Sequence, residues 1–238
     1  MRFMAVGGTQ RSLGLDRGEL RTGRKIATRT RPRGRSALQE EQSLASRQKI
    51  LDAAERAFIE NSYPATTVDD ILRRADIGRA TFYRHFSSVF DVAKGLIEQF
   101  KPTFLDLYEE LGRTSAPTIS EIENWIRHHL RMYRETSPFM VLLLEVSGAE
   151  PEFFPILKCL AHEYIGRLAI GIPAFRLAAS GQPEGRRAET AALLLIENLS
   201  SFCYLLVLRG WDIDEELAIG IIARDFARFI EEYGGQGM

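Results

Sequence analysis

The segment Arg79 to Phe86, RATFYRHF, carries the side chains of this 238-residue chain that are best suited to contact a nucleic acid. Phe82 and Phe86 are four positions apart, so they share one helix face, which we expect to be buried. The remaining positions are Arg79, Ala80, Thr81, Tyr83, Arg84 and His85. An arginine fork fits O6 and N7 of guanine, a small side chain meets the thymine methyl group, and hydroxyl, His and Arg groups hydrogen-bond phosphates. The segment is therefore typical of a helix that enters a DNA groove.

A second short helix is predicted just before this segment, from about Val68 to Ala75. Its apolar stripe is Val68, Ile71, Leu72 and Ala75. Thr67 is the expected N-cap, and Asp70 three residues later completes a capping box. Asp76 tolerates the left-handed conformation of a tight turn, which predicts a helix-turn-helix. The alternative is ordinary core packing of two amphipathic helices.

We assign the polar side chains of this motif to base edges or to the sugar-phosphate backbone according to their chemistry. Arg79, Ala80 and Arg84 are expected at base edges. The residues expected to contact phosphates are Thr67, Thr81, Tyr83 and His85. The target would be double-stranded DNA, because the helix has the dimensions of the major groove.

The stretch TTVDDILRRADIGRATFYRHF resembles the DNA-binding signature of TetR-type transcriptional regulators, T-x-x-x-I-x-x-x-A-G-V-S-x-x-T-L-Y-x-H-F. The matching residues are Thr67, Ile71, Ala75, Ile77, Thr81, Phe82, Tyr83, His85 and Phe86. The resemblance covers roughly residues 45 to 97. Asp76 and Gly78 replace the usual Gly and Ser, which weakens the cap of the second helix, and Val89 replaces a Lys that commonly contacts phosphate. The resemblance implies a bacterial, cytoplasmic, ligand-responsive regulator.

Charge is unevenly distributed along the chain. Residues 1–100 carry a net charge of +6 and residues 101–238 a net charge of −7, so the N-terminal part suits a polyanionic partner. Residues 1–41 are rich in Gly and Arg and are predicted to form a disordered basic tail. Its Arg31 to Arg35 core fits an A/T-rich minor groove; a solvated tail, upstream sequence from a misplaced start codon and a transit peptide remain open.

The composition excludes several other classes of protein. Two cysteines, Cys159 and Cys203, argue against a disulfide framework and for a reducing compartment. We expect no membrane span, because no uninterrupted apolar run reaches about 18 residues, and no signal peptide. The chain has no H-E-x-x-H, C-x-x-C, phosphate loop or G-x-S-x-G motif. We therefore predict no enzymatic activity, no metal site and no cofactor.

An all-α fold with two domains is predicted. Residues 42–100 would form the DNA-binding domain, whose first helix runs from about Ser43 to Asn61, with Asn61 as a left-handed C-cap. Residues 101–238 would form an effector-binding and dimerisation domain. Pro102 should kink or interrupt the helix that joins them. In the second domain Ser120 should cap a helix, and the segment from Phe139 to Val146 should be buried on every side.

An apolar cavity with a few polar groups is expected in the second domain, for an unidentified apolar small-molecule effector. The candidate lining residues are Trp125, His129, Tyr133, Met140, Glu145, Phe175, Asn198 and Phe202. Each is individually more often a plain core residue. Glu145 stands in an apolar helix, so it must reach solvent, pair with an Arg or meet a ligand.

The last two helices have wide apolar stripes, which favour pairing with a second copy as a four-helix bundle. The candidate interface residues are Ile196, Leu199, Cys203, Leu206, Ile222, Phe226 and Phe229. The alternative is that one chain buries both stripes. A homodimer that binds a palindromic operator as a ligand-released repressor is the resulting hypothesis. A helical-bundle enzyme and a protein-interaction adaptor that uses the helix-turn-helix surface are the alternatives.

Overall fold

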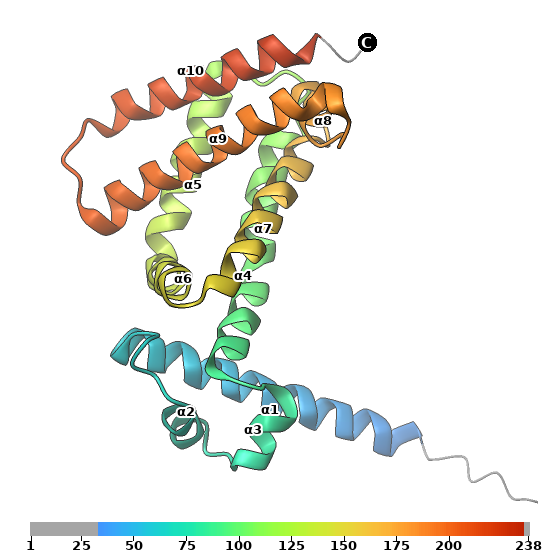
Figure 1. Cartoon of the computed structure of the whole chain (residues 1–238), viewed down its shortest axis with the longest axis vertical. Helices are drawn as coiled ribbons and strands as arrows, with labels where there is room; N and C mark the ends of the chain where they lie inside the picture. The colour runs from blue at the N-terminus through green and yellow to red at the C-terminus, as the bar shows by residue number, and fades with distance from the viewer. Residues whose placement is uncertain (1–32, 236–238) are drawn as a thin grey trace, which may run out of the picture. The chain divides into compact units, whose positions relative to one another are not determined.

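The computed structural model describes residues 33–235, and these residues form helices and connecting turns with no strand among them (Figure 1). The α-helices are α1 Arg33–Asn61, α2 Val68–Ala75, α3 Arg79–His85, α4 Val89–Gly112, α5 Ile119–Glu135, α6 Ser137–Ala149, α7 Phe154–Leu168, α8 Pro173–Ala178, α9 Arg186–Cys203 and α10 Glu215–Gly234. Short 3₁₀ turns lie at Pro151–Phe153 and Pro183–Gly185, and a π-helical turn at Tyr204–Leu208 follows α9. The predicted all-α fold class is confirmed.

Helix α1 begins earlier than the sequence indicated. Residues 33–41, assigned to the disordered tail, belong to α1, so the tail prediction is wrong there, and residues 1–32 lie outside the described residues. Among the described residues, 33–40 and those from Glu41 onward belong to two separate units. At the end of α1 the left-handed residue is Ser62, with φ 67°, and not Asn61. The Ser62 carbonyl accepts a 2.8 Å hydrogen bond from the Thr66 hydroxyl, which holds this turn.

The helix-turn-helix forms as its capping residues predicted. The Thr67 side chain accepts from the backbone N–H of Asp70 at 3.2 Å, and the Asp70 carboxylate accepts from the backbone N–H of Thr67 at 3.0 Å. Asp76 ends α2 in the left-handed conformation, with φ 52°. Gly78 stands at the N-cap of α3 without a side-chain hydrogen bond. Local side-chain chemistry therefore sets the boundaries of α2, whereas α3 begins without a side-chain cap.

Helix α4 continues from Val89 to Gly112 through Pro102, so of the two expected effects of the proline, a kink or an interruption, the interruption is wrong. Pro102 is exposed, and the Glu98 carbonyl that loses its intrahelical donor can bind water instead. The N-terminus of α4 is capped by the Ser88 hydroxyl, which accepts from the Asp91 N–H at 3.1 Å. One rigid element therefore joins the helix-turn-helix to the later helices.

Two predictions for the second domain, one of a helix N-cap and one of burial, need correction. Thr118, and not Ser120, caps α5, in a capping box with Glu121. Helix α6 is not buried on every side, because Val141 and Leu144 are 42% and 41% exposed. Apolar composition alone does not reveal which faces of a helix meet a neighbour.

Helix α9, with the turns before and after it, forms a segment from Pro183 to Leu208 that is long and apolar enough to cross a membrane by length and composition. The sequence-based expectation of no such segment overlooked it. One stripe of this segment packs against α8 and α10 of the same chain. Only 28% of its apolar window is buried, so much of its apolar surface faces outward.

The end of α4 and the turn after α7 meet at glycines. A Cβ atom on Gly112 would lie 2.1 Å from the Arg167 carbonyl oxygen, and one on Gly171 would lie 2.4 Å from the Gly112 carbonyl oxygen. Backbone atoms cannot yield as flexible side chains do. The close contact of α4 with α7, two walls of the cavity described below, therefore requires glycine at both positions.

Replacing Gly112 with alanine is expected to lower the free energy of unfolding by about 2 to 3 kcal/mol, because the methyl group forces α4 and α7 apart. Gly166→Ala is the matched control: no atom lies within 4 Å of its Cβ position. That variant should gain about 0.5 to 1 kcal/mol from helix propensity. Urea unfolding measures both, and equal effects of the two changes would contradict the close-contact argument.

Candidate nucleic-acid interface and internal cavity

Helix α3 is fixed by two buried rings on its inner face. Phe82 and Phe86 are buried, with ring centroids 6.2 Å apart. The guanidinium of Arg47, from α1, lies over the Phe86 ring at 5.1 Å. Gly95 of α4 lies against this site, because a Cβ there would be 3.0 Å from the Phe86 ring. The rings therefore anchor α3 between α1 and α4.

The opposite face of α3 points outward, as predicted. Arg79, Ala80, Tyr83 and Arg84 are exposed, whereas Thr81 and His85 are half-buried. Tyr83 is 53% exposed, although an aromatic ring of that size is commonly covered. The exposed set presents two guanidinium groups, a methyl group and a phenol on one surface.

Two of the predicted contact residues already have intramolecular partners. The Thr67 hydroxyl donates to the Asp70 carboxylate at 2.6 Å within the capping box. The guanidinium of Arg79 donates to both carboxylate oxygens of Asp69, at 2.7 and 2.8 Å. Thr67 therefore has a structural role, and Arg79 must exchange or share its partner before it can meet a base.

Arg47 is a basic residue of this surface that the motif did not reveal. It stands one turn before the buried stripe of α1 and reaches α3, where it lies near His85. Burial and the charges of Arg84 and Arg47 lower the pKa of His85, so its neutral form is favoured. The guanidinium groups of Arg47 and Arg84 give this face a positive potential.

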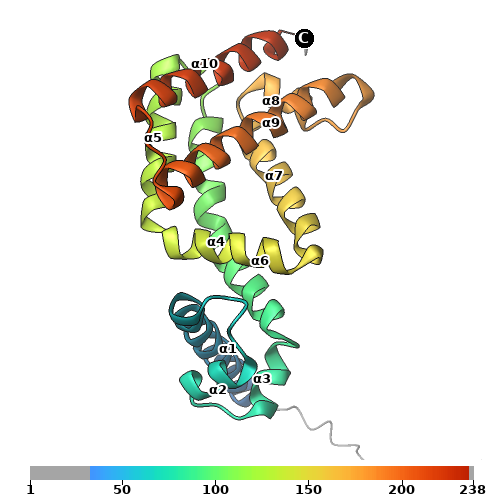
Figure 2. The same cartoon turned by 60° about the vertical axis from the view of Figure 1, so that its left-hand side comes forward.

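Glu145 has a partner that the sequence did not indicate. Its carboxylate accepts a 2.7 Å hydrogen bond from the backbone N–H of Tyr63, just after α1, and the Tyr63 hydroxyl donates to Glu150 at 2.6 Å. Figure 2 shows α6, which ends next to Glu150, crossing α4 beside the helix-turn-helix. The prediction that Glu145 lines the cavity is wrong. Both carboxylates instead attach α6 to the DNA-binding part.

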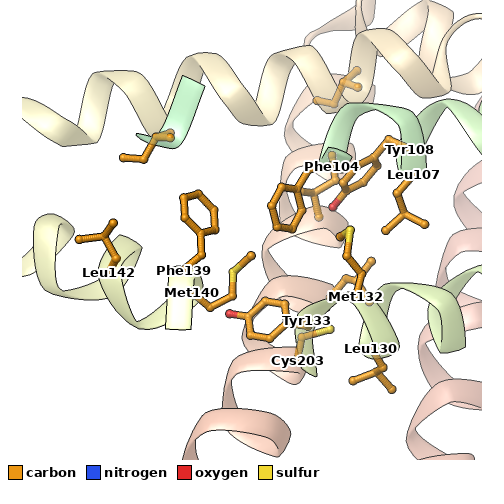
Figure 3. Close-up of a cluster of buried hydrophobic side chains, with 14 of the residues drawn as sticks. Phe104, Leu107, Tyr108, Leu130, Met132, Tyr133, Phe139, Met140, Leu142 and Cys203 are labelled. Carbon is orange, nitrogen blue, oxygen red and sulfur yellow. The ribbon is translucent and has the colours of Figure 1, made fainter. Parts of the chain in front are cut away.

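A cavity of about 270 Å³ lies between α4, α5, α6, α7 and α9. Figure 3 shows part of its lining, with Phe104 and Tyr108 from α4, Tyr133 from α5, and Phe139 and Met140 from α6. Tyr164 of α7 stacks on Tyr108 with ring centroids 4.1 Å apart. Aromatic rings thus form a substantial part of the cavity wall.

Of the eight predicted lining residues, His129, Tyr133 and Met140 border the cavity. The other five are Trp125, Glu145, Phe175, Asn198 and Phe202, and the cavity does not include them. The Trp125 indole N–H donates to the Leu107 carbonyl at 2.9 Å, and the Phe175 ring packs on Phe229. Asn198 is exposed, and Phe202 is a core residue.

Tyr108 and Tyr164 were missed as lining residues. Their only signal in the sequence is an aromatic residue in a helical apolar stripe, which ordinary core residues share. The structure brings the two rings together because α4 packs along α7. This long-range pairing has no local pattern.

Lys101 and Glu197 are the charged residues of the cavity wall, and burial keeps His129, Tyr133 and Tyr108 uncharged at neutral pH. Burial lowers the pKa of His129 to about 4, with a smaller effect from His128. Burial also raises the pKa of Tyr133 to about 12 and that of Tyr108 well above its usual value. Lys101 lies at the wall but is paired with Glu163 at 2.9 Å.

Residues 50–88 match the family described as "Bacterial regulatory proteins, tetR family", and this range contains α2, α3 and the buried half of α1. The helix-turn-helix part of the chain therefore resembles the tetR family. The uncharacterized HTH-type transcriptional regulator TtgW of Pseudomonas putida is 34% identical over 68 residues, which cover 28% of this chain and 51% of TtgW. The HTH-type regulator TtgR of the same species is 31% identical over 75 residues, 32% of this chain and 34% of TtgR. The matches thus span about half of these relatives or less.

Solved structures of TetR-family proteins share the fold over a larger part of the chain. A putative TetR-family regulator from Syntrophomonas wolfei aligns with a TM-score of 0.56 and 20% identity, over 77% of this chain and 93% of that one. The fatty acid degradation regulator FadR of Bacillus halodurans aligns with a TM-score of 0.57 and 15% identity, over 75% and 93%. At these identities the likeness concerns the fold alone.

The apolar stripes assigned to the dimer interface are largely buried within the single chain. Ile196, Leu199, Cys203, Ile222, Phe226 and Phe229 are buried, and Leu206 is half-buried. They pack on the neighbouring helices, including α5 and α8, so the interface prediction is wrong for the six buried residues and stays a prediction for Leu206. The exposed apolar side chains of α9 and α10 are Leu194, Leu217 and Ile221, at 66%, 59% and 49% exposure.

His129 should make the protein sensitive to mild acid. The unfolded chain binds a proton at this residue below pH 6.5, whereas the folded chain does so only near pH 4. Stability is therefore lost as the pH falls between these values, by about 3 kcal/mol in total. His129→Leu should reduce this loss, as measured by urea unfolding from pH 7 to 4.5.

The matched control for this measurement is His128→Gln, at the exposed neighbouring position. Interaction with Glu189 and the Lys158 carbonyl raises the pKa of His162, so His162 contributes in the opposite direction, equally in all three proteins. If the free energy of unfolding falls with pH equally in the wild type and in His129→Leu, His129 is not the source of the acid sensitivity.

Proposed function

We propose that this protein is a DNA-binding transcriptional regulator, a repressor that binds a palindromic operator as a homodimer and is released by an apolar small molecule. The observation that carries the proposal is the outward polar face of α3 above its buried rings, within the range that matches the tetR family. A cytoplasmic location follows from this role.

In the proposed complex α3 enters the major groove. Ala80 and Arg84 meet base edges, and Tyr83 donates its hydroxyl to a phosphate. Arg79 reads a base while Asp69 orients its guanidinium, or it leaves Asp69 for a phosphate. Thr81 and His85 lie at the margin of the surface, and Arg47 adds positive charge that the sequence did not predict.

The proposed dimer uses the outer surfaces of α9 and α10 and not their buried stripes. Leu194, Leu217 and Ile221 supply exposed apolar area there. Half-sites one helical turn apart require two recognition helices held at a fixed distance, which a two-fold dimer provides.

Release would pass through α6, because this helix lines the cavity and is hydrogen-bonded to the turn between α1 and α2. Met140 and Phe139 line the cavity, and Glu145 holds the Tyr63 backbone. An effector that fits a different position of α6 better shifts the population of dimers towards one whose α3 helices are wrongly spaced for the operator. The shift in operator affinity equals the differential affinity of the effector for the two states.

Substituting Arg84 with alanine should weaken operator binding at least tenfold, since a bidentate guanine contact is worth about 1 to 3 kcal/mol in each half-site. Electrophoretic mobility shift with DNA selected from a random pool, at several salt concentrations, measures the effect. Arg113→Ala, at the other end of α4, is the control and should bind as the wild type does. Unchanged binding by the Arg84 variant would remove this residue from the interface.

A charge at Leu194 should separate the dimer. Leu194→Glu is expected to sediment as a monomer at concentrations where the wild type is a dimer, because a carboxylate would be buried without a partner. Leu44→Glu replaces an equally exposed leucine of α1 and should leave the dimer intact. Analytical ultracentrifugation measures the oligomeric state of both variants. A dimeric Leu194→Glu would show that the interface does not include Leu194.

A further inference from the structure

Two polar atoms in the wall of the cavity have no hydrogen-bond partner. They are the hydroxyl oxygen of Tyr108 and Nδ1 of His129, the buried unpaired side-chain atoms found among the residues that the structure describes. Tyr108 is 1% exposed and His129 3% exposed. An unpaired buried polar group destabilises a protein, so two such groups on residues that line one cavity favour a polar partner there.

We propose that the effector is a neutral phenol, whose hydroxyl group donates to Nδ1 of His129 and accepts from the hydroxyl of Tyr108. This inference rests on the proposed function only in calling the ligand an effector; the binding site itself is independent of DNA. The rings of Tyr108 and His129 come from adjacent helices and meet edge to face, with centroids 5.5 Å apart. The two residues therefore stand next to each other in the cavity wall.

The protonation states of the two residues favour a hydroxyl group. A neutral imidazole offers one acceptor nitrogen, and a neutral phenol side chain can donate. A ligand hydroxyl supplies the matching donor and acceptor on one atom. A carboxylate would lack a free cation, because Lys101 is held by Glu163 and Glu98, at 2.9 and 3.6 Å.

The rest of the wall favours an aromatic ring. Besides Tyr108 and His129, the wall includes aromatic residues from α4, α5, α6 and α7 and from the turn after α9: Phe104, Tyr133, Phe139, Tyr164 and Tyr204. Rings stack well on such walls. A cavity of about 270 Å³, filled at the packing density of protein interiors, holds roughly 10 to 15 non-hydrogen atoms. The ligand is thus a compound with one or two rings.

Isothermal titration calorimetry on the full-length protein tests the proposal with paired probes. Each pair contains a phenol and the hydrocarbon in which methyl replaces hydroxyl: 4-phenylphenol with 4-methylbiphenyl, 2-naphthol with 2-methylnaphthalene, and 4-butylphenol with 4-butyltoluene. Biphenyl-4-carboxylate and protonated 4-phenylbenzylamine test the charged alternatives. At least one phenol should bind at least tenfold more tightly than its methyl counterpart and more tightly than either ion.

Tyr108→Phe identifies the hydrogen bond. It should weaken phenol binding about tenfold and leave the affinity for the methyl counterpart within a factor of two, because only the hydroxyl is removed. Its melting temperature without ligand should equal or exceed that of the wild type, since an unpaired polar atom is lost. Tyr233→Phe, a buried tyrosine outside the cavity, is the matched control and should change neither affinity.

Three results would overturn the proposal. The first is that no phenol binds more tightly than its methyl counterpart, and the second is that one of the ions binds more tightly than the phenols. The third is that Tyr108→Phe lowers the affinity for a phenol and for its methyl counterpart by the same factor. None of these bears on operator binding by the ligand-free protein. Mobility shift without ligand tests that function separately, so the two failures are distinguishable.

Discussion

The burial of Phe82 and Phe86 is the constraint on which the DNA-binding surface depends. Helix α3 has only seven residues and its N-cap, Gly78, provides no side-chain hydrogen bond. A helix of that length is marginal in isolation. Each buried ring contributes about 1.5 to 3 kcal/mol, so packing against α1 and α4 both forms the helix and sets its rotation. With that rotation fixed, the side chains of Tyr83 and Arg84 face outward.

Helix α6 connects this surface to the rest of the molecule. Its apolar side borders the cavity, while Glu145 at its end is hydrogen-bonded to the backbone after α1. A hydrogen bond to a charged group is stronger than one between neutral groups and is strict in geometry. A displacement of α6 by a ligand must therefore move the Tyr63 turn or break this bond. Either outcome gives the cavity a physical route to the DNA-binding helices.

Local chemistry explains which features could be predicted from the sequence. Thr67, Asp70 and Asp76 act within a few residues of their own position, so the boundaries of α2 follow from the side chains alone. The rotation of α3 could be predicted because Phe82 and Phe86 are large apolar side chains on one helix face, and that face must be buried. Fold class and helix-turn-helix were thus predictable.

The remaining features depend on contacts between distant segments. Phe226 and Ile196 were predicted at a dimer interface, but they are core residues. The prediction failed because periodicity indicates that a helix face is buried and does not indicate whether the same chain or a second copy buries it. Tyr108 lies in the cavity wall because α4 packs on α7, where its ring stacks on Tyr164. Glu145 found its partner 82 residues away in the chain. None of these pairings leaves a local signal.

Directed cleavage of DNA tests the central claim most directly. Phenanthroline-copper is attached to Ala80→Cys in a Cys159→Ser background, which removes the exposed native thiol, and the conjugate is bound to selected operator DNA. The account predicts two clusters of strand breaks separated by about 10 base pairs, one for each α3 in adjacent major grooves. Absence of cleavage on DNA that the conjugate still binds, or a single cluster, would contradict it.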